Sequence, residues 1–393
     1  RRSANSPNSN EPPPRKTSVF PRNDSLSANG EQGASLQLQP LRMREGYLSG
    51  GLRARHLSVN SGHETNAVSP HTPPFFEVWQ VLPMLCFRPQ ERTLPDALAL
   101  GASTLNLAAE RNMPVLAAHV VHGRAVVLGA TQRAGRVVDL SACARADAAV
   151  LRRVTTGTAA WIDGPALVMS LALPHVAALH EDATNRTLLN RNVRPFLRAL
   201  THAGAMAHYF GREWISLRKR PAALLGFDLT RSGAVLIEVF LGGAHSIALP
   251  KDLQTTDEQA VDRFMGKTPA GLGEIIPDVR LEVFLERFVE KFAGPAVDFV
   301  ADVSPPETPS GMLVTDVMDP WPGDYEPRAL MPVPIGYLEL GGRSSTRLLG
   351  GDALAPRWLY EDIGAGAARD KLGDMPVEGA TLDDMLRMVA ADS

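Results

Sequence analysis

The sequence predicts an α+β fold in which a mixed or antiparallel sheet is packed by helices, followed by a small C-terminal α+β unit. Short apolar runs bounded by turn residues recur between residues 115 and 241. These runs outnumber the helical patterns and often follow one another directly, which favours neighbouring strands over alternating β-α units. The hydrophobic share of 44% in 393 residues is enough for a large core.

Residues 1–75 differ from the rest in composition. They are rich in Ser, Asn, Pro and Arg, show no periodicity, and carry nine Lys/Arg against five Asp/Glu, which leaves a net charge of about −7 for the remainder. We expect a disordered or partner-bound basic extension that could contact RNA. It resembles an organelle transit segment, which would place the protein in the mitochondrial matrix. A plain disordered tail explains the composition equally well.

The first structured elements follow this extension. A strand is expected at Glu77–Pro83 and a helix at Leu94–Met113, with Thr93 as its N-cap and Pro95 in its first turn. A second helix is expected at residues 182–203, with an apolar face. Further strands are expected at residues 115–121, 125–130, 150–156, 166–173, 213–219 and 234–241.

The C-terminal half divides into three parts. A helix at Leu281–Gly294 carries an apolar stripe and closes a domain that we place at residues 76–303. Residues 304–334 contain eight prolines without periodicity and are predicted to be a linker. Residues 335–393 form the small accessory domain, whose last helix begins with Thr381 and Asp384 spaced as a capping box.

Several simple functions are disfavoured by the residues present. Cys86 and Cys143 are too few for a disulfide framework or a zinc site, and we expect both to be buried thiols. His119 and His122 would lie on opposite faces of a strand, so a shared metal ion is not expected. No run approaches the roughly 18 apolar residues of a membrane span. The GKT triplet at residues 266–268 lacks the first glycine of a P-loop.

Five segments, in chain order, resemble the lipoate–protein ligase family, which shares its fold with biotin ligases and octanoyltransferases. "RTLPDALALG" is similar to the opening helix, and "AVVLGATQRAG" to the strand and turn before the binding loop. "RRVTTGTAAWID" is similar to two Arg, a Gly triplet, Ala-Val and His-Asp, while "GREW" and "RKRPAAL" are similar to Gly-Arg-Asn-Asp and to Arg-Lys with a small-residue turn. The last 60 residues are weakly similar to the accessory domain of the family.

The resemblance implies ATP-dependent transfer of lipoate or octanoate, through an acyl-adenylate, to a lysine of a lipoyl-acceptor domain. Lys219 falls at the position of the catalytic lysine. The positions that bind the nucleotide and the acyl group are Arg152, Arg153, Gly157, Asp163, Gly211 and Arg212. An active enzyme would need ATP, Mg²⁺ and lipoate, and no resident metal site is expected.

The same motifs also depart from the family pattern. Thr156 and Thr158 stand where glycines let the backbone approach the ligand, and Arg220-Pro221 stiffens the turn after Lys219. Losing one preorganised polar contact typically costs about 10²- to 10³-fold in rate. Two hypotheses follow: a catalytically degenerate ligase homologue that is a structural or assembly subunit of a mitochondrial complex, such as a ribosome, and needs no cofactor; or an active lipoate/octanoate ligase.

The residues of the motifs also have structural explanations. The cations could form a basic surface that contacts RNA or an acidic partner. Asp163, before Gly164-Pro165, suits a turn as well as catalysis. We expect Tyr209, Phe210 and Trp214 to pack in the core. The cations in question are Arg152, Arg153, Arg218, Lys219 and Arg220.

Overall fold

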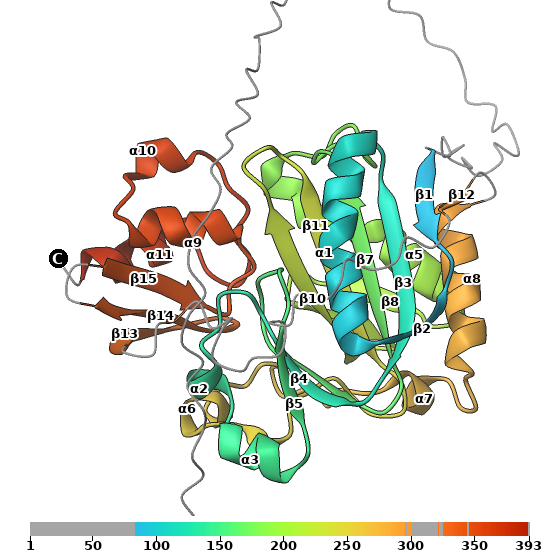
Figure 1. Ribbon diagram of the computed structural model, residues 1–393, viewed down its shortest axis with the longest axis horizontal. Helices are drawn as coiled ribbons and strands as arrows, with labels where there is room; N and C mark the ends of the chain where they lie inside the picture. The colour runs from blue at the N-terminus through green and yellow to red at the C-terminus, as the bar shows by residue number, and fades with distance from the viewer. Residues whose placement is uncertain (1–82, 295–296, 301–320, 322–324, 344–345, 392–393) are drawn as a thin grey trace, which may run out of the picture. The chain divides into compact units, whose positions relative to one another are not determined.

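The computed structural model of the chain describes residues 83–294, 297–300, 321, 325–343 and 346–391 (Figure 1). By its internal contacts the chain divides into residues 1–75 and residues 76–393, and all described residues belong to the second unit. The described residues form helices and a mixed sheet, which confirms the predicted α+β class. Apart from Pro83, the strand expected at Glu77–Pro83 lies outside the described residues.

Nine strands form the main sheet. They are β1 (Met84–Phe87), β2 (Gln90–Thr93), β3 (Val115–His122), β7 (Ala166–Leu173), β8 (Ala207–Tyr209), β9 (Trp214–Leu217), β10 (Arg220–Leu229), β11 (Val235–Gly242) and β12 (Val297–Val300). Their order is β12-β1-β3-β7-β11-β10-β9-β8, and β2 also pairs with β3. Parallel pairs join β12 to β1 and both β1 and β2 to β3, whereas the remaining pairs are antiparallel.

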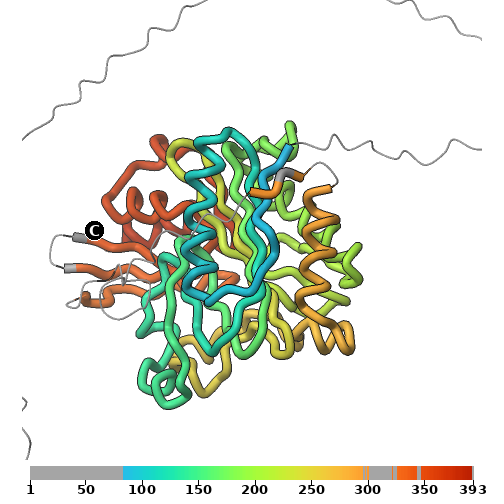
Figure 2. The backbone as a smooth tube through the Cα atoms, turned by 45° about the vertical axis from the view of Figure 1, so that its right-hand side comes forward, coloured from blue at the N-terminus to red at the C-terminus, as the bar shows by residue number. Residues whose placement is uncertain are grey.

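The pairing of β12 with β1 joins distant parts of the sequence. Met84 lies opposite Val297 and Phe87 lies opposite Val300 in a parallel register. The two strands lie side by side at one end of the sheet, as Figures 1 and 2 show in blue and orange. The first described strand of the chain therefore obtains its outer neighbour only after the long helix that precedes β12.

One face of the main sheet is covered by α1 (Leu94–Arg111), which begins as predicted. Thr93 caps it by accepting a hydrogen bond from the backbone N–H of Asp96. Gly101 brings α1 close to the sheet, because a Cβ at this position would lie 2.7 Å from Ser170 Oγ and 2.9 Å from Glu238 Oε1. The contact explains a glycine in the middle of a helix, where it costs stability relative to alanine.

A smaller three-stranded sheet packs on the same face as α1. Its strands are β4 (Arg124–Leu128), β5 (Ala149–Arg152) and β6 (Ala160–Asp163), in the order β5-β4-β6. Two short helices, α2 (Ala134–Val137) and α3 (Leu140–Arg145), connect β4 with β5. Val127, Leu151 and Ile162 of this sheet share a buried cluster with Val168 and Phe240 of the main sheet. The two sheets therefore have a common core.

The opposite face of the main sheet is covered by α5 (Arg194–His202) and α8 (Leu281–Ala293). Phe196 contacts Phe288 and Phe292 there, with ring centroids 6.1 and 4.9 Å apart. The helix predicted at residues 182–203 is shorter than expected, because it begins at α4 (Leu188–Asn192) after a 3₁₀ turn, η1 (Asn185–Thr187), and breaks at Val193. Its predicted apolar face is correct.

Residues between β11 and α8 form short elements without a sheet. They are η2 (Lys251–Leu253), α6 (Thr256–Gln259) and α7 (Leu272–Ile275). Among the described residues, no helix has the length and hydrophobicity that a membrane crossing requires. In the same residues, no group of three or more His, Cys, Asp or Glu is arranged to hold a metal ion.

The C-terminal unit packs three helices against a separate antiparallel sheet. Its elements are β13 (Glu326–Val333), β14 (Gly336–Arg343), β15 (Thr346–Gly351), α9 (Arg357–Gly364), α10 (Arg369–Leu372) and α11 (Leu382–Ala390). The capping box of Thr381 and Asp384 is present, as predicted. Residues 326–333 were assigned to the linker, yet they form β13, an edge strand in which Pro327 and Pro332 are tolerated. Residues 304–320 of the predicted linker lie outside the described residues.

Asp352, directly after β15, joins this unit to the rest of the protein. Its fully buried carboxylate accepts hydrogen bonds from Gln132 Nε2 and Arg136 Nη2, each at 2.5 Å, and from Arg263 Nη2 at 3.2 Å. The backbone N–H of Tyr337 adds a fourth bond at 2.8 Å. Burial alone would raise the pKa of Asp352, but Arg136 and Arg263 hold it below its usual value.

Further carboxylates balance the two arginines. Glu258 pairs with Arg263 and lies 3.4 Å from Arg136 Nη1. Glu339 lies 3.6 Å from Arg136 Nε and also accepts a bond of 2.6 Å from Arg133. We use the name Asp352 cluster for six residues: Asp352, Glu258, Glu339, Arg133, Arg136 and Arg263. It connects three segments, the turn after β4, the region around α6 and the C-terminal unit. Buried charges are costly unless each one is paired and hydrogen-bonded, so these segments are held in one arrangement.

Replacing Asp352 by Asn should destabilise the protein strongly. The change leaves two buried guanidinium groups without one of their carboxylates, and we expect the free energy of unfolding to fall by about 3 kcal/mol in urea denaturation. Asp362→Asn, which removes the exposed ion pair with Arg231, is the matched control and should cost at most about 1 kcal/mol. Equal losses in both variants would contradict a special role for the buried carboxylate.

The same carboxylate predicts a pH dependence. Since folding lowers the pKa of Asp352, its contribution is complete above the ordinary carboxyl value of 3.8 and is lost as the pH falls through the folded value. The stability difference between the wild type and Asp352→Asn should therefore begin to shrink as the pH falls below about 3.8 and should vanish only below the folded pKa.

Candidate functional site

Arg152, predicted to bind a ligand, is an internal brace. Only 5% of it is exposed, and its Nη1 donates to the carbonyl oxygens of Gly129 at 2.9 Å and Gln132 at 2.5 Å. These carbonyls belong to the turn after β4 that also supplies Gln132 to Asp352. Arg152 therefore stabilises the backbone that presents part of the Asp352 cluster.

Arg153 is also turned into the protein. Its Nη2 donates to the carbonyls of Thr156 at 3.1 Å and Thr158 at 2.8 Å, so it ties together the loop that follows it. Its guanidinium lies 5.2 Å from the ring centroid of Phe240. Burial lowers the pKa of Arg153 to about 10, although Glu238 opposes this shift. Assigning Arg152 and Arg153 to a basic surface was therefore wrong, because both are buried.

Gly157 adopts a backbone conformation that favours glycine, with φ of +101°. A Cβ built there would lie 2.6 Å from Leu354 Cδ2 and 3.0 Å from the carbonyl oxygen of Leu225. The glycine is thus required for a close approach, and the neighbour is the protein's own C-terminal unit. Leu354 occupies the space against this glycine.

Thr156 fixes the same segment by hydrogen bonds. Its hydroxyl accepts from the backbone N–H of Ala355 at 3.1 Å and lies 2.9 Å from the carbonyl of Phe227 and 2.8 Å from that of Ala355. One threonine side chain therefore contacts β10 and the C-terminal unit at once. The threonine that replaces a glycine of the family pattern thus holds Leu354 and Ala355 against the loop.

Glu238 is a buried acid that the sequence did not single out. It lies in β11, accepts a short hydrogen bond from Thr155 Oγ1, and faces Gly101 of α1. Burial raises the pKa of Glu238, while Thr155 and Arg153 act in the opposite direction. A lone Glu within the apolar run "AVLIEVFL" was the available signal, since such a charge in a buried strand needs partners.

Lys219 lies at the two-residue turn between β9 and β10 and is exposed. Both turn residues have positive φ, +46° for Arg218 and +70° for Lys219. Leu225, whose carbonyl lies beside Gly157, is six positions along the chain, on the order of 20 Å at about 3.3 Å per strand residue. The structure does not bring Lys219 next to Gly157.

Gly211 and Arg212 lie between β8 and β9. Gly211 has φ of +69° with open space around it, so it serves the turn. Arg212 Nε donates to Glu213 at 3.0 Å and its Nη2 donates to the carbonyl of Pro334 at 3.1 Å. Burial raises the pKa of Glu213, and the bond from Arg212 lowers it. Arg212 therefore links the main sheet to the C-terminal unit.

Asp163 ends β6 and precedes a turn at Gly164, where φ is +80°. Its carboxylate lies 3.1 Å from Arg124 Nε, opposite it in the β4–β6 pair. These contacts fit the turn interpretation of Asp163 that the sequence left open.

Predictions about the remaining residues had mixed outcomes. Cys86 and Cys143 are buried free thiols, as expected. His119 is buried and His122 is exposed, which confirms opposite faces of the strand. Trp214 is buried and Tyr209 is half-buried, but the prediction for Phe210 was wrong, because 64% of it is exposed just beyond β8.

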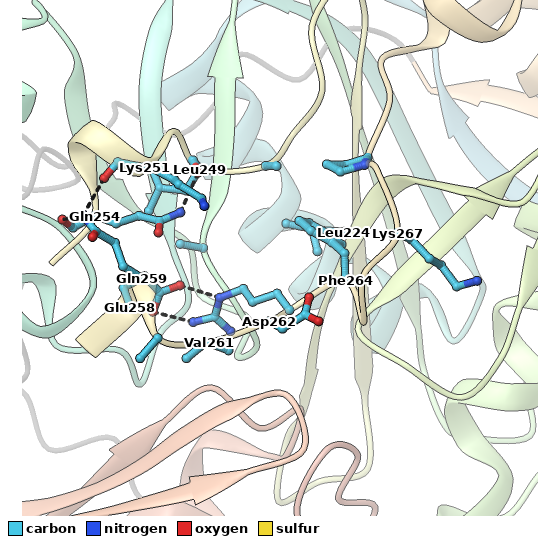
Figure 3. Close-up of a pocket in the computed structure, with 15 residues that line it drawn as sticks. Leu224, Leu249, Lys251, Gln254, Glu258, Gln259, Val261, Asp262, Phe264 and Lys267 are labelled. Carbon is cyan, nitrogen blue, oxygen red and sulfur yellow. Dashed lines mark hydrogen bonds and ion pairs between the residues drawn. The ribbon is translucent and has the colours of Figure 1, made fainter. Parts of the chain in front are cut away.

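A pocket of about 410 Å³ lies beside the segments "RRVTTGTAAWID" and "RKRPAAL", which contribute Ala159 and Leu224 to its lining (Figure 3). Its apolar wall includes Ala159, Leu224 and Phe264, and its polar groups include Lys251 and Lys267. Figure 3 shows Lys267 directed away from the other lining side chains. The volume is in the range of small-molecule sites. Glu258 and Arg263 of the Asp352 cluster form part of the wall, and none of the lining residues was predicted as a site residue.

Comparisons with known proteins find the fold through structure alone. No family model matches the chain, and no curated protein matches it by sequence. Among solved structures it is similar to P. falciparum LipL1 in complex with lipoate, with a TM-score of 0.57 and 15% identity over 79% of this chain and 99% of that one. A bi-partite lipoate protein ligase from Thermoplasma acidophilum matches 56% of this chain and 87% of its own, with a TM-score of 0.45 and 18% identity. The chain thus has the fold of lipoate–protein ligases.

Two glycine substitutions test how tightly the loop is covered. Gly157→Ala should lower the free energy of unfolding by at least about 2 kcal/mol, because it combines backbone strain with a clash against Leu354 and the Leu225 carbonyl. Gly164→Ala has a similar positive φ but nothing within 4 Å, so about 1 kcal/mol is expected. Urea denaturation measures both; equal costs would show that the Leu354 contact is loose.

Proposed function

We propose that this chain, which has the fold of lipoate–protein ligases, has lost ligase activity and acts as a structural or assembly subunit of a larger complex in the mitochondrial matrix, with a ribosome as one candidate. The supporting observation is the packing of Leu354 and Ala355 against Thr156 and Gly157. In the family that the sequence resembles, this loop must approach the nucleotide and the acyl group.

The contacts of three motif arginines support the same proposal. Arg152 and Arg153 donate to backbone carbonyls, and Arg212 donates to Glu213 and Pro334. Their positive charges are used to hold segments of the protein together. Fold stability alone accounts for keeping these three residues, so their presence does not require a reaction. RNA contacts through the basic residues 1–75 are a further part of this proposal.

The test is an acylation assay on the full chain. Purified protein with ATP, Mg²⁺, lipoate or octanoate and a lipoyl-acceptor domain is expected to give neither acyl-adenylate nor acylated lysine by mass spectrometry. A lipoate–protein ligase of the same fold, assayed in parallel, is the positive control. Lysine acylation by the wild type that disappears in Lys219→Ala would overturn the proposal.

An active ligase is the second candidate, and the pocket favours it. Its volume of about 410 Å³ could accommodate an acid with an apolar chain, with the ammonium group of Lys251 attracting the anionic end. Lipoate and ATP would then have to bind away from the covered Gly157. This candidate therefore predicts ligand binding that depends on the pocket lining.

Filling the pocket tests the second candidate directly. If it holds, lipoate or ATP at 100 times its dissociation constant stabilises the wild type by about 2.7 kcal/mol, seen as a higher melting temperature. Leu224→Trp should abolish this stabilisation, because the indole occupies the pocket. Leu140→Trp, at an exposed position on α3, is the control and should keep it. A wild type that neither ligand stabilises would rule this candidate out.

A further inference from the structure

Exposed apolar side chains concentrate around β8, the last strand of the main sheet. Six large apolar residues are exposed among the described residues: Leu140, Met206, Phe210, Met265, Phe299 and Leu330. Met206 and Phe210 flank β8 and are 57% and 64% exposed, and Met265 is 61% exposed. Two of the six therefore lie at the ends of β8, and Met265 lies in the loop after α6.

Contacts link each of the three residues to β8 or to a loop at one of its ends. Phe210 stacks on His208 with ring centroids 6.1 Å apart. Two positions after Phe210, Arg212 reaches Met265 through a contact of 3.2 Å between Nη1 and Sδ. Met206 accepts a backbone hydrogen bond of 2.9 Å from Arg218, so it lies beside the β9–β10 turn.

Cations border the apolar residues. Arg218 and Lys219 occupy the β9–β10 turn, and Lys267 follows Met265; all three are exposed. Arg220 is different, because it is bound to the Thr268 and Pro269 carbonyls and to Glu274. Those bonds also tie the turn to the segment that carries Met265. The β8 surface comprises Met206, His208, Phe210, Arg218, Lys219, Met265 and Lys267.

The β9–β10 turn is built in a way that keeps its cations outside. Two-residue turns with positive φ at both positions favour Asn-Gly, because other residues are strained there. Arg218 and Lys219 hold these positions instead, with φ of +46° and +70°. Both residues are exposed at the end of the hairpin, and Arg218 is hydrogen-bonded to the backbone of Met206.

We propose that the β8 surface binds an acidic segment of another protein that carries apolar side chains. Carboxylates would pair with the three cations, while apolar groups would cover Phe210 and the two methionines. Methionine adapts its shape to varied partners, and aromatic residues with methionine are enriched at protein interfaces. This inference names the chemistry of the partner and rests on the proposed role as an assembly subunit.

Other occupants fit the surface less well. A second copy of the chain would bring Arg218 and Lys219 toward like charges. RNA binding depends mainly on many phosphate contacts, and here apolar side chains are as numerous as the three cations. Phe210 could stack on one base, but the methionines offer a nucleotide little. An acidic and apolar protein segment uses both parts of the surface.

Fluorescence anisotropy with defined probes tests this proposal on the full chain. The probe is a labelled twelve-residue peptide in which Glu-Asp alternates with Leu-Phe, and it should bind the wild type. A peptide with the same acids and Ser in place of Leu and Phe should bind at least about tenfold more weakly, a difference of 1.4 kcal/mol. A twelve-nucleotide oligouridylate should bind more weakly than the first peptide.

Variants assign the binding to the β8 surface. Phe210→Ser and the double variant Arg218→Glu/Lys219→Glu should each weaken binding of the first peptide at least about tenfold, with unchanged melting temperatures because the side chains are exposed. Leu140→Ser and Arg145→Glu change exposed residues of α3 and are the matched controls, which should bind as the wild type does. Controls that lose as much affinity would place the binding elsewhere and overturn the proposal.

The remaining outcomes are also decisive. Absence of peptide binding overturns the acidic-segment proposal, and tighter binding of oligouridylate that is lost in the same variants makes the surface an RNA site instead. Since neither ATP nor lipoate is present, the result does not depend on whether the chain has ligase activity. Failure of peptide binding therefore counts against the acidic-segment proposal alone, whereas the acylation assay tests the assembly-subunit proposal.

Discussion

The buried carboxylate of Asp352 is the constraint on which the arrangement of the described segments depends. It is removed from water, and it is compensated by guanidinium groups from two separate segments, Arg136 after β4 and Arg263 after α6. Such a charge tolerates little displacement, because lost pairing leaves an ion in a medium that solvates it poorly. The position of β15 is therefore set by electrostatics as well as by apolar packing. Leu354 and Ala355 follow Asp352 by two and three residues, so they are carried onto the loop at Gly157.

The fold could be predicted further from the sequence than the site could. Apolar runs and the cap at Thr93 gave most strands and α1, since period and capping are local properties. The edge strand β13 was missed, because Pro327 and Pro332 suggest a linker unless the strand is known to pair on one side only. The order of strands in the main sheet, with β12 beside β1, depends on distant segments and had no local signal.

For the site, the sequence indicates residue types but not the orientations of their side chains. An arginine pair before a glycine loop looks the same in sequence whether it faces a ligand or, as for Arg152 and Arg153, the carbonyls of its own backbone. Aromatic residues usually pack in the core, which predicts a buried Phe210, yet it follows the last strand of the sheet and is 64% exposed. Glu238 was overlooked inside an apolar run, although burying its charge requires the partners that the structure shows.

The parallel pair of β1 and β12 has a consequence for biosynthesis. A strand near the start of the described chain completes its hydrogen bonding only when residues 297–300 have been made, so the edge of the nascent sheet stays unfinished through most of translation. Contacts of such long sequence separation slow folding and expose apolar strands in the meantime. In the growing chain β1 therefore has only β3 as a neighbour until residues 297–300 have been made.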